Sequence, residues 1–339
     1  MGPLLCLLSA VGFGLMAVFA KAAYGDGVSV QALLLVRFAM AAAVLLAVAA
    51  GTGALRRLTP RAVAVGLAMG VFGYAVQSTF YFSALQHLDA SLVALVFYVY
   101  PATVMVAAIA IGRESPSRRR LGALGVALAG TVLVLAGAAT GQFDVLGVLL
   151  ALGAAGTYTC YILVGDRVTG GIPPVALSGL VCAGAAAAFL VAGAARGGTD
   201  LGFEPRAWIW LTAIALVGTV GGVLMFFAGL ARVGPSTAAI LSAVEPVTTV
   251  GSAALVFGEV LTPAQLAGGA LVLAAVVLVQ LRPPEVEEAG HAPEVEEAGH
   301  GPLVEEAGHG RLETPGPALP LVEEAGHGRL ETPGPALLT

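Results

Sequence analysis

The chain has 339 residues, of which 58% are hydrophobic and 11% are charged. A water-soluble domain has about 25% charged residues, so this composition indicates an integral membrane protein. The net charge of −5 conceals two opposite parts, because residues 1–282 have 14 basic and 9 acidic residues whereas residues 283–339 have 2 and 12. The only lysine, Lys21, precedes two alanines, which excludes ATP hydrolysis by a phosphate-binding Gly-Lys-Ser/Thr loop.

Ten apolar runs follow one another along residues 1–282, each near the ~20 residues that a helix needs to cross a bilayer. Glycine, proline and charged residues separate them. We predict helices at residues 3–23, 30–50, 61–85, 89–111, 119–139, 145–164, 174–195, 207–231, 235–258 and 264–282. The predicted fold class is therefore an all-α integral membrane protein with ten transmembrane helices.

The basic residues of short loops predict the orientation, because Lys and Arg near span ends are retained on the cytoplasmic side. The loops after the second and fourth predicted helices contain Arg56, Arg57, Arg61, Arg113, Arg118, Arg119 and Arg120. If both loops are cytoplasmic, ten spans place both termini in the cytoplasm as well.

The segment 283–339 differs in composition from the rest of the chain. Val-Glu-Glu-Ala-Gly-His begins at Val286, Val295, Val304 and Val322. Because these repeats have no apolar periodicity and cannot bury a core, we expect a disordered acidic tail. Weak metal binding by the tail histidines is the alternative to a plain solvated repeat.

The first two predicted domains, residues 1–139 and 140–282, repeat each other at an offset of 145 residues. The matched pairs include Ser91 and Ser236, Pro101 and Pro246, and Glu114 and Glu259. Each half has five spans, an odd number, so the second half enters the membrane from the opposite side. Inverted repeats of this kind permit a central cavity to open alternately to the two sides.

A hydroxyl residue and a proline follow each matched glutamate, and they predict helix starts at Ser115-Pro116 and Thr262-Pro263. Gln265 lies three residues after Thr262, which is the spacing of a capping box.

Short motifs recur in both halves. The stretch 84–134 has Ser91, Tyr100-Pro101, Gly112-x-Glu114 and Gly122, and the stretch 229–281 has Ser236, Glu245-Pro246, Gly258-Glu259, Thr262 and Gly268. Both resemble the EamA domain of the drug/metabolite transporter superfamily, and Arg37-Phe38 lies where that family tends to have Arg. The resemblance implies ten helices, cytoplasmic termini and secondary transport, often export of amino acids or other metabolites. It also implies a bacterial-type inner (plasma) membrane. One departure is that glycine follows 8 residues after Glu114 but 9 after Glu259.

The predicted helix 235–258 has a polar stripe, because Ser242, Glu245, Thr249 and Ser252 recur at steps of three and four. Glu245 falls near the middle of this span, where an ionised carboxylate is costly unless it is paired or hydrated. We interpret Glu245 as a proton-coupling site or a partner for a substrate ammonium group. The alternative is a protonated structural glutamate beside the break at Pro246.

Polar and aromatic residues of three other spans predict the remaining walls of a cavity. They are Gln77 and Tyr81, Tyr98 and Tyr100, and Tyr158 and Tyr161. Tyrosine rings and hydroxyls suit an amphipathic solute. Because Tyr98 and Tyr100 are two residues apart on one predicted helix, we expect only one of them to face the cavity. Each tyrosine has packing or membrane anchoring as its alternative role.

Arg37 lies about seven residues into its predicted helix, or ~10 Å from its start. It is a candidate for a substrate carboxylate or a helix end, with snorkelling to the outer interface as the alternative. Glu114 and Glu259 fall at span ends, where we expect capping or interhelical contacts. Pro101 and Pro246 are predicted to be structural.

Together these features predict a secondary transporter that exports a small organic metabolite, an amino acid or a related amphipathic solute. Its partners would be the solute, a proton as candidate coupling ion and the lipid bilayer, with no nucleic acid, cofactor or metal. The oligomeric state stays open. One alternative is a membrane sensor or scaffold whose tail binds a partner. An integral-membrane enzyme is the other, but residues 1–282 have only one histidine for its chemistry.

The inverted repeat predicts that Glu114 and Glu259 lie at opposite membrane faces. An impermeant thiol reagent added outside the cell should therefore modify a cysteine introduced at Val260 but not one introduced at Ser117. Equal labelling at the two positions would contradict the inverted topology.

Overall fold

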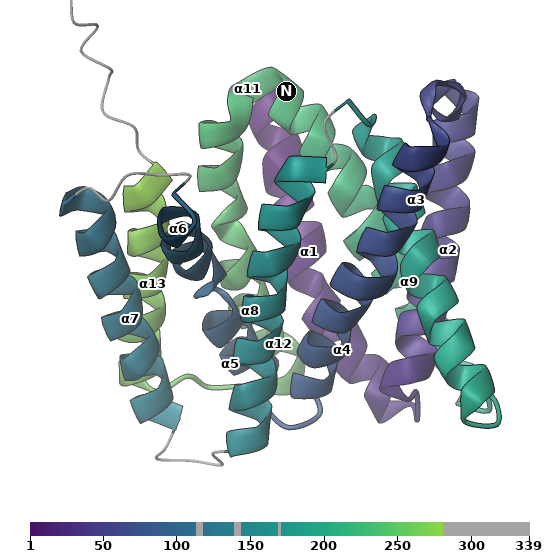
Figure 1. The fold of residues 1–339 in the computed structure, drawn as a ribbon. Helices are drawn as coiled ribbons and strands as arrows, with labels where there is room; N and C mark the ends of the chain where they lie inside the picture. The colour runs from purple at the N-terminus through teal and green to yellow at the C-terminus, as the bar shows by residue number, and fades with distance from the viewer. Residues whose placement is uncertain (113–117, 139–143, 169–170, 281–339) are drawn as a thin grey trace, which may run out of the picture. The chain divides into compact units, whose positions relative to one another are not determined.

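The computed structural model describes residues 1–112, 118–138, 144–168 and 171–280, and every regular element within these ranges is a helix (Figure 1). They belong to a compact unit that runs from Met1 to Glu285. The predicted tail 283–339 and the predicted cap at Glu114, Ser115 and Pro116 lie outside the described residues. The all-α class is confirmed for the part of the chain that is described.

The helices of the first half are α1 (Gly2–Gly25), α2 (Val30–Gly51), the 3₁₀ turn η1 (Ala54–Arg57), α3 (Pro60–Ala68), the π-helical segment η2 (Met69–Tyr74), α4 (Ala75–Ala84), α5 (Ala90–Phe97), α6 (Tyr100–Ala110) and α7 (Arg118–Ala138). Those of the second half are α8 (Val145–Val168), α9 (Pro174–Ala195), α10 (Ala207–Ala213), the π-helical segment η3 (Ile214–Gly221), α11 (Gly222–Ser242), α12 (Val244–Phe257) and α13 (Pro263–Gln280).

Among the described residues, seven helical runs are long and apolar enough to cross a membrane. They are Gly2–Gly25, Val30–Gly51, Pro60–Ala84, Ala90–Ala110, Val145–Gly165, Pro174–Ala195 and Ala207–Val233. Three further apolar helices are shorter, at Leu121–Gly137, Val244–Phe257 and Pro263–Leu278. The ten segments follow the chain in the predicted order, but only seven of them have full spanning length.

Side-chain caps mark the starts of several helices. At α2 the Ser29 hydroxyl accepts a hydrogen bond from the Ala32 amide at 3.1 Å. At α13 the Gln265 amide donates to the Thr262 hydroxyl at 3.2 Å, and the Thr262 amide donates to the Gln265 side chain at 2.8 Å. The capping box predicted from this spacing is therefore confirmed.

The start predicted for the helix at 235–258 is wrong, because α11 continues to Ser242 and α12 begins at Val244. Proline lacks an amide hydrogen, which is no loss in the first turn of a helix, where amides have no intrahelical partner. Pro246 lies in that first turn, and the break falls just before it. Glu245, predicted near the middle of its helix, therefore lies at the N-terminal end of α12.

The predicted helix at 89–111 is broken in the same way. The helix α5 ends at Phe97, and α6 begins at Tyr100 with Pro101 in its first turn. Since Tyr100 and Glu245 are 145 residues apart, the two halves break at equivalent positions.

The third helix of each half contains a π-helical segment. The segment η2 begins at Met69 and η3 begins at Ile214, which again is an offset of 145 residues. Such segments interrupt the regular hydrogen bonding of a helix and are frequent at functional sites. The two halves therefore share the π-helical segment as well, which the hydrophobic periodicity of the sequence did not predict.

Two pairs of equivalent helices, α2 with α9 and α7 with α13, pack against each other and run antiparallel. In the α2 and α9 pair, the Gln31 side chain donates to the Phe189 carbonyl oxygen at 3.5 Å, near the start of α2 and toward the end of α9. Leu46, toward the end of α2, packs against Gly179 near the start of α9.

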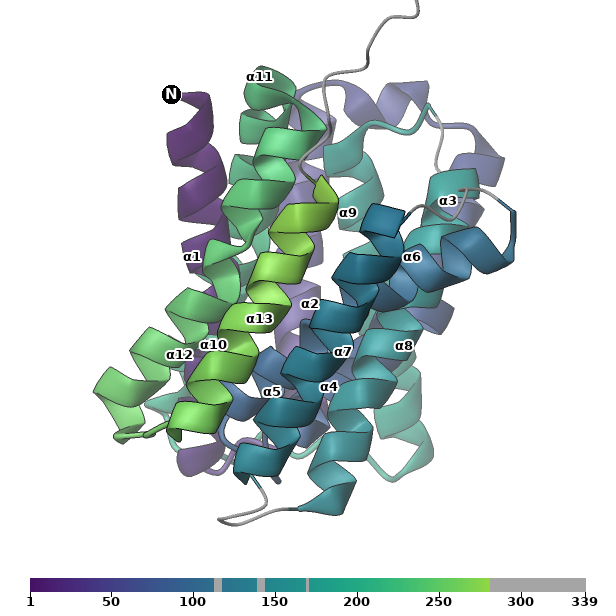
Figure 2. The ribbon, with the colours of Figure 1, turned by 90° about the vertical axis from the view of Figure 1, so that its left-hand side faces the viewer.

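The pair α7 and α13 lies side by side in both views (Figures 1 and 2). A Cβ atom placed on Gly130 would lie 2.7 Å from the Gly268 carbonyl oxygen, and one on Gly137 would lie 2.9 Å from Gln265 Cγ. Residue numbers therefore rise along α7 as they fall along α13, so this pair is antiparallel too. The close approach depends on glycine.

We predict that Gly130→Ala lowers the free energy of unfolding by about 1–3 kcal/mol, because the added methyl group pushes α13 away from α7. Gly125→Ala is the matched control, since a Cβ at Gly125 on the same helix meets no atom within 4 Å. Thermal unfolding in detergent should separate the two variants. Equal melting temperatures would show that this helix contact does not depend on glycine.

Candidate functional site

A cavity of about 410 Å³ lies among helices of both halves. Its volume falls within the ~300–1,000 Å³ that is typical of small-molecule sites. Nine of the ten residues predicted for substrate binding or coupling line it: Glu245, Gln77, Tyr81, Tyr98, Tyr100, Tyr158, Tyr161, Ser242 and Arg37. The structure therefore brings together side chains from spans that are distant in the sequence.

The walls of the cavity follow the internal repeat. Nine pairs of lining residues are 145 positions apart: Phe13 and Tyr158, Met16 and Tyr161, Arg37 and Cys182, Tyr74 and Thr219, Ser78 and Val223, Tyr81 and Phe226, Phe82 and Phe227, Phe97 and Ser242, and Tyr100 and Glu245. Equivalent positions can line one cavity only where the two halves meet. The cavity therefore lies at the interface of the repeats, the usual place of a solute site in repeat-built transporters.

Glu245 lies where the two helix breaks meet. The hydroxyl of Tyr98, from the first break, donates to the Ser242 carbonyl oxygen at 2.8 Å and lies near the Glu245 carboxyl group. Glu245 occupies the first turn of α12, where the unpaired amides and the helix dipole favour a negative charge. Its carboxyl group thus has a nearby tyrosine hydroxyl, a favourable helix end and access to the cavity.

Tyr98 and Tyr100 both line the cavity, so the prediction that only one of them would do so is wrong. The prediction assumed a continuous helix, in which residues two apart point to different sides. Because the break separates Tyr98 from α6, the two rings approach each other with centroids 5.6 Å apart. The break itself makes this wall of the cavity.

Aromatic rings form a continuous wall of the cavity. Successive ring centroids lie 4.9–5.9 Å apart along the series Tyr81, Phe97, Tyr100, Tyr158, Tyr161 and Tyr74. Tyr74 was missed by the sequence analysis, although its offset of 145 from the polar Thr219 was a usable signal. An aromatic wall with hydroxyl groups provides apolar contact area for an amphipathic solute.

Arg37 is buried in the wall of the cavity with 1% of its surface exposed, which rules out snorkelling. Its Nε donates to the Thr219 hydroxyl at 2.9 Å, and its Nη2 approaches the Tyr74 hydroxyl at 3.4 Å. The guanidinium lies over the rings of Phe38 and Phe82, at 4.8 and 4.9 Å from their centroids. Among the described residues, its Nη1 has no hydrogen-bond partner.

The remaining predicted polar residues serve other contacts. Gln77 lines the cavity and accepts a hydrogen bond from the Ser78 hydroxyl at 3.2 Å. Thr249 does not line the cavity, because its hydroxyl donates to the Gly14 carbonyl oxygen of α1 at 2.9 Å. Ser252 donates to a carbonyl of its own helix. Ser242 belongs to α11, so the predicted stripe is divided between two helices.

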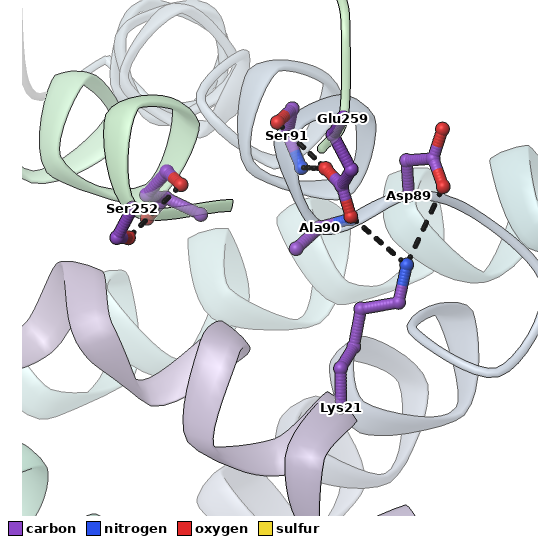
Figure 3. A network of polar contacts seen from close by, with 7 residues as sticks. Lys21, Asp89, Ala90, Ser91, Ser252 and Glu259 are labelled. Carbon is purple, nitrogen blue, oxygen red and sulfur yellow. Dashed lines mark hydrogen bonds and ion pairs between the residues drawn. The ribbon is translucent and has the colours of Figure 1, made fainter. Parts of the chain in front are cut away.

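A second polar group, the Glu259 cluster (Lys21, Asp89, Ala90, Ser91 and Glu259), lies at the start of α5 (Figure 3). One carboxylate oxygen of Glu259 accepts from the Ser91 hydroxyl at 2.7 Å and from the Ser91 amide at 3.0 Å. The other accepts from the Ala90 amide and from Lys21 Nζ, both at 3.0 Å. Lys21 Nζ also lies 3.4 Å from Asp89.

The Glu259 cluster connects the two halves. Lys21 and Ser91 belong to the first half, and Glu259 lies in the loop between α12 and α13. Partial burial works to raise the pKa of Glu259, but the hydrogen bonds from Ser91, Ala90 and Lys21 outweigh it and hold the pKa below its ordinary value. Glu259 is therefore an ionised cap on the N-terminus of α5.

Comparisons with known proteins agree with this geometry. Residues 1–136 and 145–281 each match the family described as "EamA-like transporter family". An "uncharacterized transporter" of Archaeoglobus fulgidus is 28% identical over 82% of this chain and 95% of its own length. The "uncharacterized transporter YwfM" of Bacillus subtilis is 28% identical over 49% of this chain, a match that spans 56% of that relative.

Two further comparisons concern function and fold separately. A "probable amino-acid metabolite efflux pump" of Salmonella typhimurium is 28% identical over 60% of this chain and 71% of its own length. A solved crystal structure of another protein has 20% sequence identity and a TM-score of 0.59, and it covers 82% of this chain and 96% of that one. The structural likeness supports the fold alone.

We predict that Glu259→Gln lowers the free energy of unfolding by about 1.5–3 kcal/mol at neutral pH, because it weakens charged hydrogen bonds. Since the pKa of Glu259 is lower in the folded chain, its contribution is present above the ordinary value of 4.5 and is lost as pH falls through the folded-state pKa. Thermal unfolding from pH 7 to pH 3 should show the difference between wild type and variant shrinking. Glu204→Gln, which changes an exposed acid, is the control. If the stability difference between wild type and Glu259→Gln did not depend on pH, the negative charge of Glu259 would not be the source of the stabilisation.

Proposed function

Because the chain belongs to the EamA-like transporter family, we propose that it is a secondary transporter that exports a small organic metabolite, an amino acid or a related amphipathic solute, through the central cavity. The observation that carries the proposal is the cavity itself, which equivalent residues of the two halves line together. Export of an amino-acid metabolite agrees with the name of the Salmonella relative.

The proposed architecture has ten transmembrane helices in two inverted repeats of five. Seven long apolar runs and three shorter apolar helices supply the ten segments. The antiparallel packing of α2 with α9, and of α7 with α13, supports the inversion, because a two-fold axis in the membrane plane reverses equivalent helices. We further propose an inner-membrane location with both termini in the cytoplasm, on the strength of the arginine-rich loops.

Alternating access requires one end of the cavity to be closed while the other is open. The Glu259 cluster is a candidate for such a closure. It lies one helix length from Glu245 along α12, or ~20 Å at 1.5 Å per residue, and it fastens the α12–α13 loop to α1 and α5. In the proposed cycle these hydrogen bonds form when this end is closed and break when it opens.

Glu245 is the proposed coupling residue. A bare carboxylate at membrane depth is costly, and either a proton or a substrate ammonium group removes that cost. The two therefore compete for one site. When the ammonium group of a solute binds from the cytoplasm, the proton of Glu245 leaves to the cytoplasm. After the solute is released outside, a proton from that side replaces it, and one proton enters for each solute exported.

We predict that Glu245→Gln expresses normally but loses pH-dependent export, because the amide keeps the size of the side chain and cannot titrate. In liposomes loaded with a panel of radiolabelled amino acids, wild-type efflux should rise when the outside is made acidic. The variant should lose that response, and its apparent affinity for amino acids should fall about tenfold or more.

Glu204→Gln is the matched control, since Glu204 is an exposed acid in the loop before α10 and does not line the cavity. Its efflux should equal that of wild type at every pH. Wild-type flux and pH dependence in the Glu245 variant would reduce Glu245 to a structural acid.

A further inference from the structure

The guanidinium of Arg37 is a buried cation with unused hydrogen-bonding capacity. Its Nη1 has no hydrogen-bond partner in the part of the chain that the structure describes, and the Tyr74 contact of Nη2, at 3.4 Å, is longer than an ordinary hydrogen bond. Among the described residues, no carboxylate lies within ion-pair distance of Arg37. A buried charge without an ionic partner is costly, so the protein maintains this cation for a reason other than stability.

The position of Arg37 is fixed by both repeats. Tyr74 and Thr219, its two hydrogen-bond partners, are equivalent residues of the two π-helical segments. Phe82 and the neighbouring Phe38 cover the guanidinium from the sides. The planar group is therefore held in the wall of the cavity before any solute arrives, which lowers the entropy cost of binding.

We propose that Arg37 binds the carboxylate of the transported solute, and that Arg37 and Glu245 together restrict the cavity to zwitterions. This inference rests on the proposed function and specifies its substrate class. The guanidinium is suited to the task because its donors form a planar fork that matches a carboxylate, and such charged hydrogen bonds are strong.

The charge pattern of the lining selects against other solutes. The described residues that line the cavity include one basic residue, Arg37, and one acidic residue, Glu245. A simple amine would satisfy Glu245 but leave Arg37 unpaired and repel it, and a simple carboxylate would do the reverse. A solute with both groups pairs both buried charges and adds no net charge, while the aromatic wall receives its apolar part.

The test compares solutes that differ in one charged group. The full-length wild-type protein in liposomes is given L-phenylalanine and L-leucine, their methyl esters, which lack the carboxylate, and their N-acetyl forms, which lack the ammonium group. Efflux of the free amino acids should exceed that of both derivatives by about tenfold or more. Methyl esters exported as well as the free amino acids would overturn the proposal.

Variants then assign the preference to Arg37. In Arg37→Gln the preference for the free amino acid over its ester should disappear, whereas Arg37→Lys should retain part of it because the charge remains. Thr219→Val removes the hydrogen-bond partner of Arg37 Nε but keeps the charge of Arg37. This variant replaces Arg37→Gln in the test if Arg37→Gln does not fold. We expect it to weaken the preference by raising the apparent KM of the amino acid without improving export of the ester. An unchanged preference in every folded variant would overturn the proposal.

The outcomes separate this inference from the proposed function. Wild-type export of amines or of N-acetyl compounds, with no preference for zwitterions, would exclude the role of Arg37 but leave a secondary transporter. Loss of amino-acid binding when chloride replaces methanesulfonate would identify Arg37 as an inorganic anion site and overturn the carboxylate assignment. Absence of flux for every member of the panel would contradict the proposed function as well.

Discussion

The hydrogen bond from the Tyr98 hydroxyl to the Ser242 carbonyl oxygen joins the two places where the membrane helices break. Each break precedes a proline, Pro101 or Pro246. A helix tolerates proline in its first turn but not in its interior. The breaks place helix ends, and side chains such as Tyr98 and Glu245, at the interface of the repeats. Without them, Glu245 would lie within a continuous helix, and Tyr98 and Tyr100 would point in different directions.

The backbones of the two halves are similar around the cavity, but their charged side chains differ. The two halves share their helix breaks and their π-helical segments, yet the charged residues have uncharged equivalents. Arg37 of the first half matches Cys182, and Glu245 of the second half matches Tyr100. Each half therefore contributes one charge, so a bound zwitterion would bridge the two halves.

The sequence predicted nine of the 24 described residues that line the cavity, but little of its geometry. Spacing of proline and glutamate identified the repeat, and polar residues within apolar spans identified nine lining residues, because burial of such groups in a membrane is exceptional. Periodicity failed at the breaks, since it presumes a continuous helix. It therefore included Thr249, which bonds the backbone of α1, and overlooked Tyr74, whose orientation depends on a π-helical segment.

In the proposed transport cycle, the placement of the charges would link solute binding to the movement that alternating access requires. If the two halves rock about the cavity, the separation of Arg37 and Glu245 changes, because they belong to different halves. A zwitterion of fixed length would be held best in one arrangement, and its binding would therefore change the relative energies of the inward-open and outward-open states. If the Glu259 cluster is the proposed closure, this difference in energy would have to exceed the free energy that breaking its hydrogen bonds costs. A solute with only one of the two charged groups would form an ion pair with only one half. It would therefore have little effect on the relative energies of the inward-open and outward-open states.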